Sequence, residues 1–157
     1  MTDLVFQPRG HHFEQFEIGQ KIVTVSRTVT EADIVNFAGL TGDFNQIHTD
    51  AEYAARGPFS KRVAHGMLIQ SIGIGLAVQS GIIEGTVLAF REQTTKFSLP
   101  VFIGDTIHVK LEITEKKSLP RLGGGNINMK YRVYNQHGKA VQRGDWIMLI
   151  KSDSSLD

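Results

Sequence analysis

The segment FAGLTGDFNQIHTDAEYA, residues 37–54, brings two residues that can move protons close together. Asp43 and His48 are separated by four residues, and Asn45 lies between them. A histidine titrates near neutral pH, and a carboxylate beside it can orient it or share its proton. The pair could therefore act as acid and base on one water molecule. An isolated motif of this spacing also arises where an aspartate caps a turn and a histidine packs, so it leaves both interpretations open.

A second chemical feature is the stretch VAHGM, residues 63–67, which opens a long apolar segment. A helix that begins here presents unpaired backbone N–H groups and the positive end of its dipole. Gly66 has no side chain, so an oxygen of a substrate could approach its N–H closely. This geometry stabilises an enolate oxygen. Plain helix entry, with Gly66 relieving a steric clash, explains the stretch equally well on its own.

The elements before these motifs follow from local patterns. The segment from Lys21 to Thr28 is rich in Val, Ile and Thr, which predicts a strand. Thr30 and Asp33 have the spacing of a helix N-cap, and glycines 39 and 42 can end the helix that follows. Asp50 can cap a second short helix, AEYAAR. The polar residues between these two helices then lie in a glycine-flanked loop that can aim them into one cleft.

The segment from His65 to about Ser80 is apolar on nearly every side, which predicts a helix buried all round. Small residues Gly73 and Gly75 would let other backbone approach it closely. Four β-type runs follow it, joined by turn residues that include a flexible triple glycine at 123–125: Thr86–Phe97, Asp105–Glu115, Asn126–Asn135 and Ala140–Lys151. This order predicts an α+β fold with one central helix. A strongly curved antiparallel sheet wrapped around that helix is the simplest way to bury it, but the order alone leaves other α+β folds open.

The composition narrows the class of protein. The 157 residues fit one domain, 1–157, with a core of about 13–150, a loose N-terminal lead-in and a polar C-terminal tail. Lys plus Arg number 17 and Asp plus Glu 16, which gives no electrostatic footprint for nucleic acid or an anionic membrane. The chain has no cysteine, no signal-peptide pattern and no apolar run long enough for a membrane span, so we expect a cytoplasmic protein. His11 and His12 have no third ligand at useful spacing, so we expect no metal there and exposed side chains.

Taken together, three motifs resemble those of the MaoC-like, R-specific enoyl-CoA hydratase family. They are GDFNQIH at 42–48, HGM at 65–67 and KFSLPVFIGD at 96–105. The resemblance covers about residues 13–150 in the family's order. It implies a hot-dog fold and a homodimer that forms by edge-to-edge sheet pairing. It also implies an acyl-CoA thioester as the binding partner and neither a metal nor an organic cofactor.

The resemblance also assigns roles to residues. Asp43 and His48 match the family's catalytic pair, and Asn45 matches the residue that holds the catalytic water or its loop. Gly66 matches the residue whose N–H meets the thioester oxygen. Gln46 stands where the family usually has proline, which bears on loop rigidity and substrate choice. The implied reaction is reversible addition of water to a trans-2-enoyl-CoA, which gives an (R)-3-hydroxyacyl-CoA.

Other functions stay open at this point. The substrate of a related dehydratase can be a branched or dicarboxylic hydroxyacyl-CoA. Hot-dog thioesterases usually carry a catalytic acid on or near the central helix, and the segment from His65 to Ile83 has none. A non-catalytic acyl-CoA-binding module would not need both Asp43 and His48. Four cations are candidates to meet the phosphates of CoA, and a position in solvent explains each of them equally well: Lys61, Arg62, Arg91 and Lys96.

Overall fold

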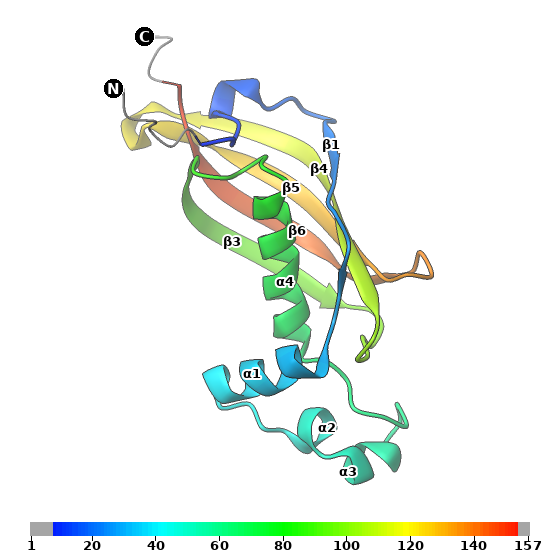
Figure 1. Ribbon diagram of the computed structural model, residues 1–157. Coiled ribbons are helices and arrows are strands. Elements are labelled where there is room, and N and C mark those ends of the chain that lie inside the picture. The colour runs from blue at the N-terminus through cyan, green and yellow to red at the C-terminus, as the bar shows by residue number, and fades with distance from the viewer. Residues whose placement is uncertain (1–7, 154–157) are drawn as a thin grey trace, which may run out of the picture.

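The computed structural model describes residues 8–153. Its main body is an antiparallel six-stranded sheet in the order β1-β4-β5-β6-β3, with β2 paired to β4 off this path. Helix α4 crosses one face of the sheet, and helices α1 to α3 lie together beyond one end of α4 (Figure 1). The elements are β1 Lys21–Val23, β2 Arg27–Thr28, α1 Glu31–Thr41, α2 Gln46–Thr49, α3 Ala51–Ala55, α4 Gly66–Gln79, β3 Val87–Phe97, β4 Thr106–Leu119, β5 Gly124–Tyr134 and β6 Ala140–Lys151, with short 3₁₀ helices η1 Phe13–Gln15 and η2 Pro120–Leu122.

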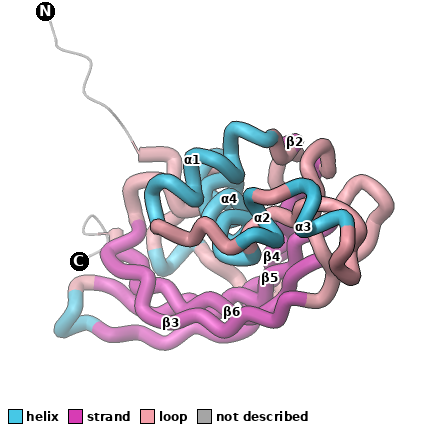
Figure 2. Tube along the Cα trace, turned by 90° about the horizontal axis from the view of Figure 1, so that it is seen from below, coloured by secondary structure: helices cyan, strands magenta, loops and turns pink. Residues whose placement is uncertain are grey.

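Alternating burial along the long strands explains why the sheet holds the helix on one face. In β5, for example, Met129, Tyr131 and Val133 are buried, whereas Lys130 and Arg132 between them are exposed. Successive side chains of a strand point to opposite faces, so the buried set forms one apolar surface. Helices α1 to α4 gather on that side of the sheet (Figure 2). A curved antiparallel sheet around one central helix is the hot-dog fold, as the sequence predicted.

Helix α4 is the central helix, but it is not buried all round. Its sheet-facing residues are buried, and a Cβ atom at Gly73 would lie 3.4 Å from the side chain of Val109. The predicted approach of other backbone is not found, because Gly73 meets only the side chains of Val109 and Val133 and Gly75 has nothing within 4 Å. On another face, Met67 is 47% exposed and Val78 is 39% exposed. The prediction of complete burial is wrong because one face of α4 is left uncovered in the single chain.

The strand predicted for residues 21–28 is divided in two. Between β1 and β2, the hydroxyl of Thr24 accepts a hydrogen bond from the backbone N–H of Val109 at 2.9 Å. The backbone N–H of Thr24 in turn donates to the carbonyl of Val109 at 3.0 Å. A side-chain oxygen thus takes the place of one backbone acceptor, which interrupts the regular ladder. The residue types in this segment do not predict that a side-chain oxygen takes the place of a backbone oxygen.

The glycines at 123–125 are not a flexible connection as a group. Only Gly123 forms the turn, with φ of 69°, whereas the next two glycines belong to β5 and are buried. A Cβ atom at Gly124 would lie 1.9 Å from the carbonyl oxygen of Ile150. At Gly125 it would meet the ring of Phe13 at 2.3 Å. These two positions are glycine because other groups occupy the space of a side chain.

The ends of the described chain are held in place, in contrast to the loose lead-in and tail expected from the sequence. The N–H of Gly10 donates to the carbonyl of Glu84 at 2.9 Å, and the N–H of Ser152 donates to that of Gly123 at 3.0 Å. His11 is half-buried against Phe16 rather than exposed, with ring centroids 5.5 Å apart. The remainder of the predicted lead-in and tail, residues 1–7 and 154–157, lies outside the described residues.

Substituting Gly124 by alanine tests the packing of β5. The added methyl group would overlap backbone of β6, so we expect G124A to lose about 2 kcal/mol or more of unfolding free energy. Gly39 is a matched control, because it lies in the interior of α1 with nothing within 4 Å. G39A should gain about 0.5–1 kcal/mol from the better helix propensity of alanine. Urea unfolding of the two variants measures both changes, and an unchanged midpoint for G124A would contradict the packing described.

Candidate active site

A capped helix and a left-handed turn place Asp43. Helix α1 begins at the N-cap Thr30, whose side chain and that of Asp33 form the predicted capping box. It ends at Gly42, whose φ of 79° suits glycine, whereas Gly39 lies inside the helix. Asp43 follows directly, and its backbone N–H donates to the hydroxyl of Thr41 at 3.2 Å. The chain therefore turns sharply just before the exposed carboxylate.

His48 lies on the short helix α2 rather than in a loop. Asn45 caps this helix, and its side-chain oxygen accepts a hydrogen bond from the N–H of Ile47 at 3.4 Å. The carboxylate of Asp43 in turn accepts a hydrogen bond from the N–H of Asn45 at 3.2 Å. These two hydrogen bonds link Asp43 to the start of α2, and so to His48. This short helix was missed because four residues carry too little periodicity to predict one.

The ring of His48 has a defined tautomer. The side chain is 8% exposed, and its Nδ1 lies 2.7 Å from the carbonyl oxygen of Val63. A carbonyl oxygen only accepts hydrogen bonds, so Nδ1 carries the hydrogen and donates. In the neutral ring this leaves a lone pair on Nε2. His48 can therefore accept a proton at Nε2 while its other nitrogen fixes the ring.

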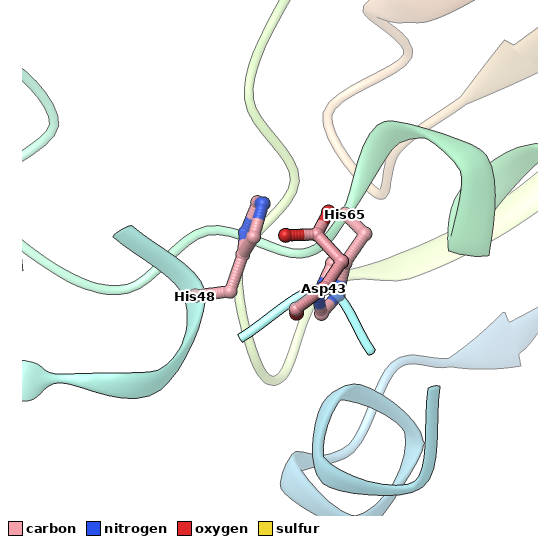
Figure 3. Close-up of side chains that lie close together, drawn as sticks. All are labelled: Asp43, His48 and His65. Carbon is pink, nitrogen blue, oxygen red and sulfur yellow. The ribbon is translucent and has the colours of Figure 1, made fainter. Parts of the chain in front are cut away.

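A second histidine, His65, joins the pair, although no role for its side chain was predicted from the sequence. A carboxylate oxygen of Asp43 and one ring nitrogen from each histidine all lie within 4.8 Å of one another. In Figure 3 the carboxylate points toward the ring of His48, and His65 lies behind the main chain of Asp43. His65 precedes α4 as its N-cap residue, far from Asp43 in the sequence. Only the fold brings the two together.

The two histidine rings are stacked, which bears on metal binding. Their centroids are 3.9 Å apart and their planes are inclined by 29°. A ring nitrogen offers its lone pair in the plane of the ring, so two nearly parallel rings do not direct both lone pairs at one ion. Asp43, His48 and His65 are the group in the described chain that comes nearest to a metal site. The prediction that no metal is bound stays a prediction, and the stacking supports it.

Gly66 is the first residue of α4, where a helix has no intrahelical acceptor for its N–H groups. A Cβ atom at this position would lie 2.5 Å from the ring of Phe97. Its carbonyl oxygen accepts a hydrogen bond from the buried side chain of Gln142 at 2.7 Å. Gly66 therefore permits the close contact with Phe97, and Gln142 fixes its peptide. Sequence reasoning missed Gln142 because it reads as an ordinary polar residue in a strand.

A cavity of about 500 Å³ collects these groups. Three of the four predicted site residues line it, namely Asp43, His48 and Gly66, whereas Asn45 does not and instead caps α2. Apolar side chains form most of the remaining wall, as is usual for a pocket that holds a small organic ligand. The lining residues are Phe37, Asp43, His48, Phe59, Val63, Ala64, His65, Gly66, Met67, Ile69, Phe97, Ser98, Leu99, Pro100, Val101 and Gln142.

The arrangement of an acid/base pair beside a helix N-terminus agrees with a known family. A family profile described as "MaoC like domain" matches residues 13–131. The chain belongs to the MaoC-like dehydratase family. Within the described residues of this MaoC-like chain, no helix has the length and apolar character to span a membrane. The cytoplasmic location stays a prediction.

Similar proteins include both curated sequences and solved structures. Protein MaoC of Klebsiella aerogenes is 39% identical over 109 residues, which are 69% of this chain and 32% of that protein. The (R)-specific enoyl-CoA hydratase of Aeromonas caviae is 30% identical over 137 residues, which are 87% of this chain and 97% of that enzyme. The structure of R-hydratase PhaJ1 from Pseudomonas aeruginosa is 35% identical, with a TM-score of 0.75 over 90% of this chain and 86% of that one. The MaoC-like chain thus spans about a third of the first of these relatives and most of the other two.

Proposed function

We propose that the protein catalyses reversible hydration of a trans-2-enoyl-CoA to an (R)-3-hydroxyacyl-CoA. The observation that carries the proposal is the single cavity that joins Asp43, His48 and the N-terminus of α4 at Gly66. Two relatives similar over most of the chain bear the names (R)-specific enoyl-CoA hydratase and R-hydratase. The positions of the acid/base pair and of the free helix end suit this reaction.

In the proposed reaction, one water molecule is held between the carboxylate of Asp43 and Nε2 of His48. Its oxygen forms a bond to Cβ of the substrate as the double bond between Cα and Cβ is lost. The pair takes one proton from the water, and one proton is delivered to Cα, so the elements of water are added overall. General acid–base catalysis of this kind contributes about 10²–10⁴-fold to a rate.

Negative charge develops on the thioester oxygen when Cβ is attacked. The N–H of Gly66 lies at the positive end of the α4 dipole and can donate to that oxygen. The thioester spreads the charge without a metal or an organic cofactor. Asn45 acts in this scheme through the loop, because its side chain caps α2 and does not line the cavity.

Mixing the purified protein with crotonyl-CoA tests the reaction directly. We expect loss of the enoyl ultraviolet band, formation of the (R)-3-hydroxy product, and the same rate after exhaustive treatment with EDTA. Release of free CoA would instead indicate a thioesterase, although α4 carries no acidic residue. Branched and dicarboxylic hydroxyacyl-CoA substrates, assayed in the dehydration direction, would reveal a related dehydratase. Activity that disappears with EDTA and returns with one divalent ion would contradict the metal-free scheme.

Substitution of the acid/base pair gives a second test. D43N and H48Q should each lower kcat by about 10²–10⁴-fold, because each removes a group that moves a proton. The double variant should be hardly slower than either single one, since the two residues act as a unit. H137Q is a matched control, because His137 lies exposed in the turn between β5 and β6. Near wild-type turnover in D43N or H48Q, with circular dichroism showing a folded protein, would refute the assignment.

We also propose that two chains pair along β3. This strand pairs with β6 on one side, and no other described strand pairs with its second side. Proteins rarely leave such an edge open, because its unpaired N–H and C=O groups attract other strands. Leu88 of β3 is 50% exposed and Phe90 is 37% exposed. Leu88 and the exposed residues of α4, Met67 and Val78, add apolar surface of the kind that an interface covers.

Light scattering at micromolar concentration measures the assembly. We expect a mass about twice the chain mass of 17.4 kDa. L88E places a charge on the edge strand and should shift the mass toward the monomer. L122E is a matched control, because Leu122 is 49% exposed in η2, which is not part of β3. A fully active protein of the chain mass would rule out the dimer as a requirement for activity.

A further inference from the structure

We propose that His65 is a positioning residue that ties together the two members of the acid/base pair, Asp43 and His48. The kinetic test of this inference rests on the proposed hydratase function, because it measures kcat and KM. The test by NMR of the histidine tautomers does not depend on that function. Two separate contacts carry it, one to the main chain of Asp43 and one to the ring of His48. Each contact uses a different part of the imidazole, so each can be removed without the other.

The first contact is a hydrogen bond across the cavity wall. Nε2 of His65 lies 2.9 Å from the backbone carbonyl oxygen of Asp43, which only accepts, so Nε2 carries the hydrogen. Asp43 itself is exposed on the turn after α1. Its carboxylate is held locally by the N–H of Asn45. The hydrogen bond from His65 ties this turn to the start of α4, and so sets the direction from which the carboxylate reaches the cavity.

The second contact is the stack on His48. The ring of His65 lies against that of His48 with 3.9 Å between centroids, and Phe37 packs on His65 at 5.1 Å. The hydrogen bond from Nδ1 of His48 to Val63 fixes one edge of that ring. The stack restrains the tilt that this single hydrogen bond leaves free. His65 is itself 2% exposed, so it is a rigid surface for the ring.

Neither nitrogen of His65 is available for proton transfer. Nε2–H is engaged by the carbonyl of Asp43, and Nδ1 is buried, with no hydrogen-bond partner among residues 8–153. An unpaired buried nitrogen costs stability, so its presence calls for an explanation. Positioning explains it, because the ring is needed at this place for its face and for its Nε2–H. His65 therefore acts through Asp43 and His48 rather than on the substrate.

Two substitutions separate the contacts. H65F keeps an aromatic face for His48 and removes the donor to Asp43, whereas H65Q keeps an N–H donor and removes the face. We expect each to lower kcat by about 10–100-fold with KM within about threefold of wild type, because small displacements of catalytic groups slow chemistry more than binding. H137F and H137Q are the matched controls and should leave both constants unchanged. Wild-type kcat in both folded His65 variants would overturn the proposal.

A double-mutant cycle shows whether His65 acts through the pair. In the H48Q background there is no imidazole to position, so adding H65Q should change kcat by less than about twofold. If the losses from H48Q and H65Q multiply, His65 acts independently and the proposal is wrong. A loss that appears in KM alone would also overturn it, because that would indicate a contact with substrate.

NMR of the wild-type protein labelled with ¹⁵N-histidine provides a readout that needs neither turnover nor a folded variant. We expect the Nε2–H tautomer for His65 and the Nδ1–H tautomer for His48. The Nδ1–H tautomer for His65 would exclude the hydrogen bond to Asp43 and overturn the proposal, whether or not the variants fold. Absence of wild-type turnover on crotonyl-CoA and longer enoyl-CoA esters, with both tautomers as expected, would refute the hydratase function and leave the positioning role intact.

Discussion

Burial of one face of α4 against the sheet is the constraint on which the rest of the structure depends. Residues such as Leu68, Ile69 and Ile72 are buried in the core, and Gly73 lets the helix pack closely on Val109 of the sheet. A helix fixed in this way has a fixed N-terminus. Because Gly66 is the first residue of that helix and His65 is its N-cap, the packing of the core sets the place of the Gly66 N–H, which we propose binds the thioester oxygen. Asp43 and His48 need only be brought to that point by the chain that precedes it.

The candidate active site is built from main-chain contacts more than from contacts between side chains. His48 bonds to the carbonyl of Val63, His65 to that of Asp43, and Gln142 to that of Gly66. The acceptors lie on segments that are far apart in the sequence from their donors. Such contacts fix the backbone and leave the functional atoms free, namely Oδ2 of Asp43, Nε2 of His48 and the N–H of Gly66, while Oδ1 of Asp43 accepts from the N–H of Asn45. A rigid frame with free functional atoms suits a site that must hold a water molecule in one orientation.

The sequence predicted what depends on local residue types and on motif order. The α+β class, the capped helix at Thr30, the central helix and the four long strands were all recovered, with β4 and β5 longer than expected. Asp43, His48 and Gly66 were expected at one site and line one cavity. The features that were missed depend on partners distant in the chain. His65 stacks on a residue of α2, and Gly124 leaves no room for a side chain beside Ile150. The hydroxyl of Thr24 accepts from the backbone N–H of Val109 in β4, where a regular ladder would use a backbone carbonyl. No local pattern in the sequence predicts contacts between residues so far apart in the chain.

The cavity and the open edge of the sheet share residues, which links the site to the proposed assembly. Met67 lines the cavity and is also on the uncovered face of α4, and Phe97 lines the cavity at the end of the edge strand β3. In the single chain both side chains are about half exposed. A second sheet paired along β3 would lie beside this wall and exclude water from it. Hydrogen bonds and charges act more strongly where water is excluded, so pairing of the chains would reinforce the contact between Gly66 and the developing oxyanion. The edge that an isolated hot-dog unit leaves unpaired therefore lies beside the part of the candidate site that Met67 and Phe97 line.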